Sequence, residues 1–391
     1  MQKNTLILPV LLFLCLLCWQ LTLSVPATPA EPNLKVFEAA WKTVNEKYFD
    51  IRFNGIDWTS MRETFRPQAV AAVDEQELYR VINQMLGELR DSHTFAISPT
   101  EVLNAQRRVN LNIGLIGRIT ENRVIYTRVL EGSAAQAAGI QPGWILTHIN
   151  GAPIDASSFS GFALGNGETL RLTFLDAQDT VREVRLLARP FKDVPERGAK
   201  MFDDGTLYIR FESFYIPDIG KWFKKTIASH REARALIIDL RGNWGGLASE
   251  LQGCLAQLYA QPAAFGEFIG RGGTERRLRV SGGGREAFGG KVVVLIDEDS
   301  FSAAELFAAA VQESGRGKVV GRRSKGGALN NVEEKLPDGG KLYVSVRNYR
   351  TNRGQHIEGR GVEPDITVSV RLDDLRHNID RDLERALQLV K

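Results

Sequence analysis

Cysteine is scarce in this chain: its 391 residues include only Cys15, Cys18 and Cys254. The first two lie in an apolar N-terminal run typical of a removable leader, so Cys254 alone would remain. One cysteine excludes an intrachain disulfide and a zinc site built from several thiolates. Cys254 falls in the helical apolar pattern Leu247–Tyr259, which favours a small core residue over the nucleophile of a cysteine protease.

Histidine is also scarce, and neither sign of charge is in clear excess. The five histidines show no metal-ligand spacing, so we expect no metal site. The net charge is +3, and the basic residues are scattered without the aromatic-interleaved stripe of a nucleic-acid-binding protein. We therefore expect no cofactor, no nucleic-acid partner and no attraction to an anionic membrane surface.

A long apolar run occupies Leu6–Leu17 near the N-terminus. Lys3 precedes it and small residues follow it, which is the pattern of a secretory signal peptide at residues 1–30, with cleavage after Ala27 or Ala30. The run is short for a membrane span, so tethering by an uncleaved signal is the alternative. The sequence thus predicts an exported protein, periplasmic or secreted.

The chain length indicates two or three domains, and apolar periodicity locates them. Residues 34–108 have the spacing of helices and residues 110–190 the alternation of strands, which predicts an N-terminal helical domain and a small β-rich domain. Residues 195–372 alternate strands with helices and predict an α/β layered core. Within it, the glycine- and arginine-rich residues 262–290 are expected to form a surface loop, and residues 373–391 should form one closing helix.

Single elements can also be predicted from these patterns. Apolar residues at helical spacing are Val36, Ala39, Ala40 and Val44, then Leu78, Val81, Ile82, Met85 and Leu86. Strands are expected at Val124–Tyr126, Leu170–Phe174, Leu207–Phe211, Ala235–Asp239, Val292–Ile296, Val319–Val320 and Leu342–Asn348. Helices are expected from Asp57, at Ser133–Gly139, Ile219–Ser229, Leu247–Tyr259 and Ala303–Ser314.

A turn of small residues, Ser300–Glu305, connects an apolar strand at Lys291–Ile296 to an apolar helix at Leu306–Val311. A hydroxyl in such a turn lies at the helix N-terminus, where free N–H groups and the helix dipole stabilise negative charge. This suits a serine nucleophile whose reaction creates an oxyanion. The alternative for Ser300 or Ser302 is a helix N-cap, the commoner role of serine at this position.

Three further segments accompany this turn in a specific order: Asp239–Gly246, Gly321–Gly327 and Glu358–Asp365. Together they resemble the carboxy-terminal processing (tail-specific) peptidases and the tricorn-core-like serine peptidases, over residues 35–370. Residues 133–151 resemble a PDZ domain, with a short helix, a glycine, Pro-Gly, a strand and Asn-Gly. The resemblance implies an α/β fold with a layered ClpP/crotonase-like peptidase core, an inserted PDZ domain and an N-terminal helical domain.

The resemblance also implies roles for single residues. Ser302 matches the family nucleophile, and Ser300 is better suited to shaping the turn. The oxyanion hole would use the N–H groups of Ala303 and of a glycine in the Gly245-Gly246 pair, because glycine lets the backbone approach a substrate closely.

The general base has two candidates. Tail-specific peptidases carry a lysine in a Gly-x-x-Thr-x-Gly-Lys segment, and alignment through Gly321 puts Gly327 at the lysine position. Lys325 comes two residues before that position. On an extended chain, this shift moves a side chain by about 6–7 Å, which is longer than a hydrogen bond. A Ser302/Lys325 dyad, which would need a rearranged loop, is therefore the alternative.

The tricorn-like branch uses a Ser-His-Ser-Glu arrangement, and Ser92-His93 and Glu358 match it here. The resemblance implies that His93 takes the proton of Ser302 and later gives it to the leaving amine, while Ser92 or Glu358 orients the ring. The other interpretation is a structural histidine that bridges the helical domain to the core. Asp91 is expected to act through hydrogen bonds, without a part in catalysis.

PDZ domains bind an extended peptide as an added strand and hold its terminal carboxylate in backbone N–H groups. The matching loop here contains Ile113, Gly114 and Leu115. The resemblance therefore implies that this domain binds the C-terminal segment of a substrate. The alternative is a domain that only packs against the core or gates it.

The combined prediction is an exported serine endopeptidase that hydrolyses peptide bonds through an acyl-enzyme on Ser302, with His93 as general base. Its partner would be a peptide or protein substrate bound through its C-terminus, and a homo-oligomer is compatible with the sequence. The alternatives are a Ser302/Lys325 peptidase and a catalytically degenerate protein that binds peptides through the PDZ domain or serves as a scaffold. The sequence specifies neither the physiological substrate nor the cleavage-site preference.

Overall fold

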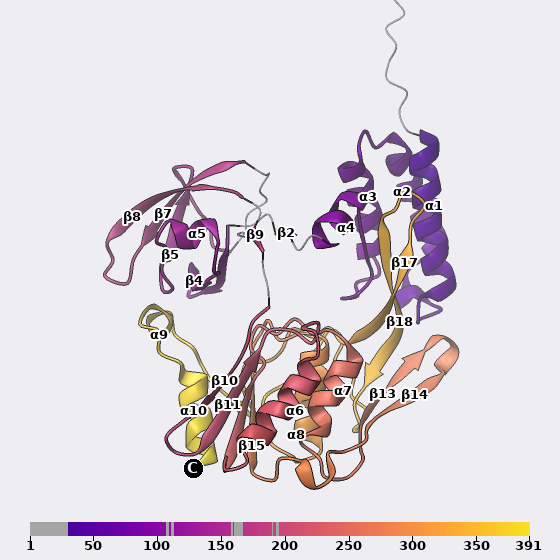
Figure 1. The fold of residues 1–391 in the computed structure, drawn as a ribbon. Coiled ribbons are helices and arrows are strands. Elements are labelled where there is room, and N and C mark those ends of the chain that lie inside the picture. Colours follow the sequence, from indigo (N-terminus) through magenta and orange to yellow (C-terminus); the bar gives the residue numbers. More distant parts are fainter. Residues whose placement is uncertain are drawn as a thin grey trace, which may run out of the picture.

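The computed structural model describes residues 30–106, 109–110, 113–157, 159, 167–189, 191–192 and 195–391. It is a mixed α/β fold in which an N-terminal helical region and a β-rich region both lie on an α/β core (Figure 1). The predicted signal peptide at residues 1–30 lies outside the described residues, apart from Ala30, where the first helix begins. Within the described part of the chain, no helix is long and apolar enough to cross a membrane.

Four helices form the N-terminal region, and the first three surround one apolar cluster. They are α1 (Ala30–Lys47), α2 (Trp58–Ala71), α3 (Glu75–Gly87) and α4 (Pro99–Gln106). The side chains of Asp57 and Asp74 accept N–H groups in the first turns of α2 and α3, as helix N-caps do. The apolar positions predicted for two helices lie in α1 and α3, and all but Ala39 are buried. These helices pack against Leu342 and Val344, which ties the helical region to the core.

The β-rich region is an antiparallel sheet in the order β3-β4-β5-β7-β8, with β6 paired to β5. Its elements are β3 (Leu115–Thr120), β4 (Arg123–Val129), α5 (Ala134–Ala137), β5 (Ile145–Ile149), β6 (Ala152–Pro153), β7 (Thr169–Leu175) and β8 (Val181–Leu187). A separate pair of short strands, β2 (Val109–Asn110) and β9 (Phe191–Lys192), lies where the chain enters and leaves this region. The chain thus enters and leaves the region at one place, and β3 is an edge strand of its sheet.

A second sheet of six strands forms the centre of the core, in the order β10-β11-β12-β15-β16-β19. The strands from β11 to β19 are parallel, and β10 pairs antiparallel at one edge. Their bounds are β10 (Arg197–Met201), β11 (Thr206–Phe211), β12 (Ala235–Asp239), β15 (Lys291–Ile296), β16 (Lys318–Gly321) and β19 (Ile366–Thr367). The strands predicted here from apolar runs are confirmed, because parallel strands buried on both faces carry continuous apolar sequence.

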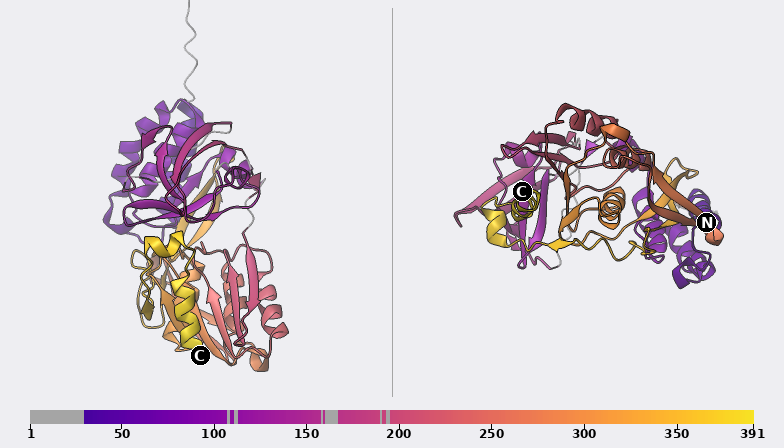
Figure 2. Two further views of the ribbon diagram at one scale, coloured as in Figure 1. Left: turned by 90° about the vertical axis from the view of Figure 1, so that its left-hand side faces the viewer. Right: turned by 90° about the horizontal axis from the view of Figure 1, so that it is seen from below.

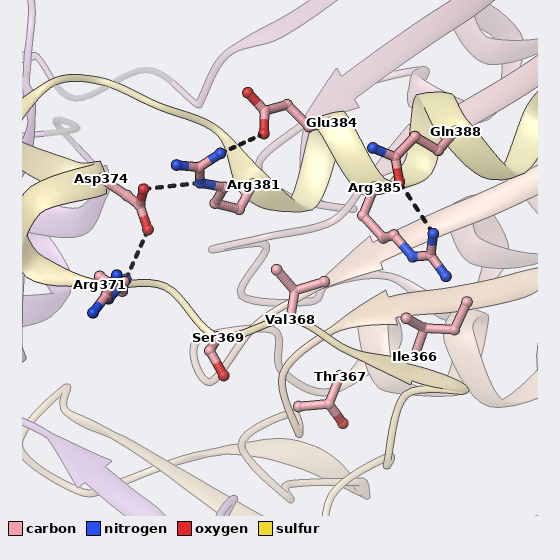
Figure 3. A pocket seen from close by; sticks show the side chains of 10 residues that line it. All are labelled: Ile366, Thr367, Val368, Ser369, Arg371, Asp374, Arg381, Glu384, Arg385 and Gln388. Atoms are coloured by element: carbon pink, nitrogen blue, oxygen red, sulfur yellow. Dashed lines mark hydrogen bonds and ion pairs between the residues drawn. The ribbon is translucent and has the colours of Figure 1, made fainter.

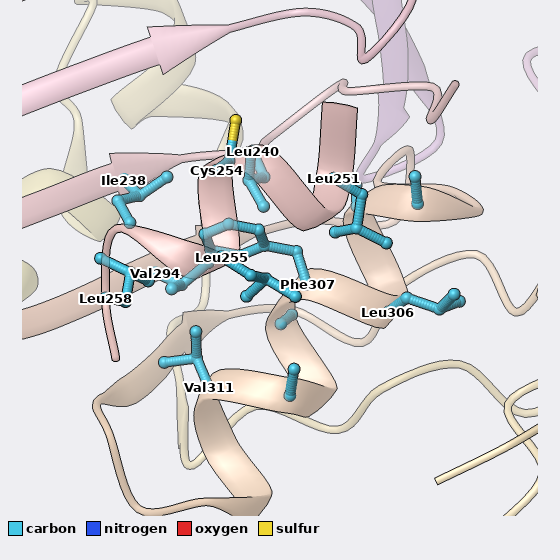
Figure 4. Close-up of a cluster of buried hydrophobic side chains, with 14 of the residues drawn as sticks. Ile238, Leu240, Leu251, Cys254, Leu255, Leu258, Val294, Leu306, Phe307 and Val311 are labelled. Carbon is cyan, nitrogen blue, oxygen red and sulfur yellow. The ribbon is translucent and has the colours of Figure 1, made fainter. Parts of the chain in front are cut away.

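Helices cover both faces of this parallel sheet. On one face, α6 (Ile219–Ser229), α7 (Ala248–Ala256) and α8 (Ala303–Glu313) pack with Ile238 and Val294. Figure 4 shows the side chains of α7 and α8 in this layer. On the other face, α10 (Arg381–Val390) packs against Ile237 and Leu295. Cys254 of α7 is fully buried in the first layer, as predicted, and burial raises the pKa of its thiol. This cysteine is therefore a core residue.

A sheet of five strands joins the helical region to the core. Its order is β1 (Phe95–Ile97), β18 (Lys341–Arg350), β13 (Ala263–Gly270) and β14 (Glu275–Val280), and β17 (Leu329–Lys335) also pairs with β18. The shared strand is β18, which pairs with β1 near its start and with β13 near its end. The β17–β18 hairpin therefore runs from the core up to the helices (Figure 1).

The prediction of a surface loop at residues 262–290 is wrong, because β13 and β14 occupy much of it. Gly266 has a φ of 112° and lies where the register between the two strands shifts. A Cβ at this position would lie 2.6 Å from the carbonyl oxygen of Arg350. The glycine that suggested a loop is thus required by a bulge in a strand.

The predicted closing helix at residues 373–391 is two helices, α9 (Leu372–Arg376) and α10. The chain breaks between them at Asn378, which has a φ of 53°, and Asp380 caps α10. Arg241 at the end of β12 forms ion pairs with Asp239 and Asp380, which fix the start of α10. The helix α9 lies below the β-rich region and contacts it (Figure 2).

Candidate active site

The chain between β15 and α8 forms a tight turn that ends at Ser302. Asp297 Oδ1 accepts the N–H groups of Gly242 and Ser300. The buried Ser300 hydroxyl donates to the carbonyl of Leu240, so Ser300 shapes the turn, as expected. Ser302 lies at the N-cap position of α8 with φ 55° and ψ −117°. This conformation is strained for a residue with a side chain, and such strain concentrates at functional sites.

Four side chains form one hydrogen-bonded chain at this turn. Ser302 Oγ lies 3.1 Å from His93 Nε2, and His93 Nδ1 lies 2.6 Å from Ser92 Oγ. The Ser92 hydroxyl donates to Glu358 Oε2 at 2.9 Å, and the Ser92 N–H donates to Glu358 Oε1 at 2.9 Å. The structure thus brings together the four side chains that the sequence singled out for catalysis.

Backbone hydrogen bonds hold the histidine in place. The segment with Ser92 and His93 lies between α3 and β1. Asp91 Oδ1 accepts the N–H groups of His93 and Thr94, and Asp91 Oδ2 accepts the Thr94 hydroxyl. The pairing of β1 with β18 then fixes this segment beside the core, opposite Tyr343. Asp91 therefore acts on the backbone of the turn, in line with the hydrogen-bonding role predicted for it.

The electrostatics of this site favour a neutral imidazole. Burial lowers the pKa of His93 to about 4, although the nearby charge of Asp91 acts to raise it. The ring is therefore uncharged near pH 7 and able to accept a proton. Burial raises the pKa of Glu358, while hydrogen bonds from Ala328 N–H and Ser92 act to lower it.

The protons available on Ser92 and His93 determine which atom donates in each hydrogen bond of this chain. Ser92 has one hydroxyl proton, which it donates to the ionised carboxylate of Glu358. Its oxygen then accepts the proton on His93 Nδ1, and Nε2 is left with a lone pair toward Ser302. This tautomer is the one that a general base for Ser302 requires.

Gly245 and Ala303 lie directly beside Ser302. A Cβ on Gly245 would lie 2.6 Å from Ser302 Cβ and 3.1 Å from Ala303 N, so only glycine permits this approach. The Gly245 N–H donates to Asn243 Oδ1 at 2.9 Å. In the described part of the chain, the N–H groups of Gly246 and Ala303 donate no hydrogen bond. Of these three residues, Gly246 and Ala303 therefore keep an N–H group that is not already used, whereas the N–H of Gly245 is taken by Asn243.

Glu305 is a positioning residue that the sequence analysis did not assign. Its buried carboxylate accepts the Ser302 N–H at 2.9 Å, the Ser324 hydroxyl at 2.6 Å, and the N–H groups of Gly326 and Gly327 at 2.7 and 2.8 Å. Burial raises the pKa of Glu305, and these hydrogen bonds act to lower it. The carboxylate thus holds a second loop against the serine turn. The sequence pattern that could have identified Glu305 is a glutamate three residues after an N-cap serine, which is the spacing of a capping box.

In the described part of the chain, Lys325 forms no hydrogen bond with Ser302. Its side chain is exposed, and its ammonium lies 5.6 Å from the centre of the Phe301 ring. At the aligned lysine position, a Cβ on Gly327 would lie 1.9 Å from Phe301 Cε2. Phe301 itself stacks on His93. The aromatic ring thus fills the space that a side chain at position 327 would need.

The three residues predicted to bind a peptide C-terminus lie at the start of β3, in the β-rich region. The carbonyl of Ile113 accepts the Ala135 N–H, and the carbonyl of Gly114 accepts the Leu130 N–H. Gly114 has a φ of 79°, which turns the chain just before Leu115 begins the edge strand. These residues take no part in the hydrogen bonds of the Ser302 site and form a separate candidate site.

A cavity of about 490 Å³ lies elsewhere, between β19 and α10 (Figure 3). Its polar side chains pair with one another, as Arg381 does with Asp374 and Glu384. None of the four side chains of the Ser302 site lines it. Clusters of three or more histidine, cysteine, aspartate or glutamate residues suited to a metal ion do not occur in the described ranges.

Family models match two parts of the chain. The model for peptidase family S41 matches residues 205–368, which include Ser302 and Glu358. The model for the tricorn protease C1 domain matches residues 29–87, which contain α1, α2 and α3. His93 lies between the two matched ranges.

Relatives and solved structures agree with these matches. A carboxyl-terminal-processing protease of Synechocystis sp. is 26% identical over 378 residues, which cover 91% of this chain and 86% of that protein. A putative tricorn protease homolog 2 of Streptomyces coelicolor is 26% identical and covers 86% of this chain and 30% of that protein. The structure of a photosystem II D1 C-terminal processing protease is 22% identical with a TM-score of 0.60, covers 92% of this chain and 97% of that one, and shares the fold.

Proposed function

We propose that this chain, which is a serine peptidase of family S41, is a carboxyl-terminal-processing endopeptidase with Ser302 as nucleophile and His93 as general base. The names of its relatives support the substrate class. The observation that carries the mechanism is the 3.1 Å contact between Ser302 Oγ and His93 Nε2. It lies within the reach of a proton transfer.

In the first step, Ser302 Oγ attacks the carbonyl carbon of the scissile peptide bond, and His93 Nε2 takes the hydroxyl proton. The imidazolium that forms donates its Nδ1–H to Ser92 Oγ. The Ser92 hydroxyl in turn donates to the carboxylate of Glu358. The negative carbonyl oxygen would accept the N–H groups of Gly246 and Ala303 at the start of α8.

The remaining steps use the same groups. His93 gives the Nε2 proton to the leaving amine as the C–N bond breaks, which leaves the acyl group on Ser302 Oγ. A water molecule then transfers a proton to His93 and attacks the acyl carbon. Ser302 recovers its proton from His93, and the carboxylic acid product leaves. The cycle consumes one water and requires no cofactor.

The β-rich region at residues 110–190 would act as a PDZ domain. Its edge strand β3 offers unpaired backbone groups, to which an extended peptide adds as a further strand beside α5. Ile113, Gly114 and Leu115 lie at the start of that strand, where the C-terminal carboxylate of a substrate would be held. The pairing of the entering strand β2 with the leaving strand β9 supports an inserted domain.

The other parts of the proposal concern fold and location. Helices on both faces of the parallel sheet support a ClpP/crotonase-like layering of the core. The apolar run at Leu6–Leu17 and the small residues after it support export by a signal peptide at residues 1–30.

The decisive test compares three variants on a peptide library. We expect His93→Ala and Ser302→Ala to lower kcat by about 10³-fold or more, and Lys325→Ala to stay within about threefold of the unmodified enzyme. Retained activity in His93→Ala with loss in Lys325→Ala would assign the base to Lys325. A serine-reactive phosphonate should label Ser302, and the absence of this adduct on the folded protein would favour a peptide-binding scaffold.

A further inference from the structure

Two large aromatic side chains are exposed side by side near Ser302. Trp244 is 48% exposed and Tyr215 is 54% exposed. Their rings are stacked, with centres 5.3 Å apart and planes 27° apart. Leu247, three residues after Trp244, is also exposed. Contiguous exposed apolar surface of this kind marks a binding surface more often than scattered single residues do.

The backbone fixes this aromatic pair to the serine turn. Trp244 directly precedes Gly245, whose α-carbon packs against Ser302. The Phe214 N–H donates to the Gly245 carbonyl at 2.7 Å, and a Cβ on Gly246 would lie 2.5 Å from Tyr215 N. Tyr215 and Trp244 therefore belong to two chain segments that lie side by side, and one of these segments contains Gly246, a proposed oxyanion donor.

A second aromatic pair lies on the histidine side of the site. Phe95, two residues after His93, is 40% exposed and stacks on Tyr343 with ring centres 4.7 Å apart. The Tyr343 hydroxyl donates to Glu333 at 2.9 Å. The Trp244–Tyr215 pair thus adjoins the turn of Ser302, and the Phe95–Tyr343 pair adjoins the segment of His93.

We propose that the Trp244–Tyr215 pair binds an aromatic side chain in the acyl half of the peptide substrate, the half whose carbonyl carbon is attacked. The inference rests on the proposed function. In acyl transfer, the carbonyl oxygen enters the oxyanion hole, while the leaving amine lies at the imidazole that protonates it. The acyl half therefore passes Trp244, and the leaving half passes Phe95.

The chemistry of the surface selects the kind of side chain. Two stacked rings present a flat apolar area, on which an aromatic ring packs in an offset or edge-on geometry. A small side chain would leave the two rings in water.

The test uses two peptides that differ only in the residue before the scissile bond, phenylalanine in one and alanine in the other. We expect Trp244→Ala to lower the ratio of their kcat/KM values by about tenfold or more, and Trp244→Phe to keep most of the ratio. The matched control is Val181→Ala, a 62% exposed apolar residue of β8 that should leave the ratio unchanged. A distorted oxyanion loop would slow both peptides by the same factor, and an unchanged ratio would overturn the inference.

A binding measurement separates this inference from the proposed mechanism. In Ser302→Ala, an uncleavable phenylalanine peptide with an amidated C-terminus should bind about tenfold more tightly than its alanine counterpart. Adding Trp244→Ala should remove that difference. Equal affinities in Ser302→Ala would contradict the inference even if both peptides are hydrolysed by the unmodified enzyme. A clear preference in binding without any hydrolysis would instead contradict the proposed function alone.

Discussion

Phe301 stacks on the imidazole of His93, with ring centres 4.8 Å apart and ring planes 14° apart. Phe301 is also the residue directly before Ser302. The turn that presents the proposed nucleophile therefore supports the proposed base as well. This contact is part of the burial that lowers the pKa of His93.

Removal of the Phe301 ring should change the pH dependence of catalysis. In Phe301→Ala, water would reach the imidazole, and its pKa should rise from about 4 toward its ordinary value. The acid limb of kcat/KM should then move to higher pH, and kcat at pH 7 should fall by about ten- to hundredfold because the ring loses its support. The pH–rate profiles of both proteins provide the measurement. Phe202→Ala, at a ring outside the site, is the control, and an acid limb that does not move would refute the prediction.

His93 should also make stability depend on pH. Its pKa is about 4 in the folded protein and about 6.5 in an unfolded chain, so the unfolded state binds more protons between these values. The contribution of His93 to the free energy of unfolding is fully present above pH 6.5. It decreases by about 3 kcal/mol as the pH falls toward 4. Urea unfolding of the unmodified protein and of His93→Gln at pH 7.5 and 4.5 would measure it. Parallel losses in the two proteins would argue against a depressed pKa.

Gly327 should not tolerate a side chain. In Gly327→Ala, the new Cβ would lie 1.9 Å from Phe301 Cε2, so the ring must move and the support of His93 is lost. We expect kcat to fall about tenfold or more. Gly289→Ala is the matched control, because nothing lies within 4 Å of its Cβ position. For the same steric reason, Gly327→Lys should fail to create a Ser302/Lys dyad, and a gain of activity in that variant would contradict the assignment of His93.

Glu305→Gln should lower both stability and kcat. In the unmodified protein, the Glu305 carboxylate accepts the N–H groups of Ser302, Gly326 and Gly327. In the variant, the NH₂ group of the amide would face some of these donors and could not accept from them. Leaving such buried donors unsatisfied costs roughly 2–4 kcal/mol. Urea unfolding measures the first effect, and kcat at saturating peptide measures the second. Glu63→Gln, at an exposed residue of α2, should change neither.

The positions of the side chains proposed for catalysis could be anticipated because each lies in a short motif. Ser302 lies between a strand and a helix whose apolar runs are plain in the sequence, and the structure has them at β15 and α8. The helix at Ile219–Ser229 was predicted with the bounds that α6 has, since its apolar residues follow a helical period without interruption. Local patterns of this kind depend on neighbours in the chain.

Contacts between distant segments could not be anticipated in the same way. That Phe301 lies on His93, and that Glu305 holds Gly326 and Gly327, depends on how separate loops meet. The strand β13 was not predicted because a glycine such as Gly266 usually indicates a loop. Here Gly266 lies at a bulge within the strand. The break between α9 and α10 depends on Asn378, whose positive φ has no signature in apolar periodicity.

The hydrogen bond between Ser92 and Glu358 joins residues 266 positions apart. A ribosome that has produced Ser92, His93 and Ser302 has therefore not yet produced the carboxylate that completes their network. A chain that ends before Glu358 would have no acceptor for the Ser92 hydroxyl proton, so the hydrogen-bonded chain from Ser302 to Glu358 closes only when almost the whole sequence is present.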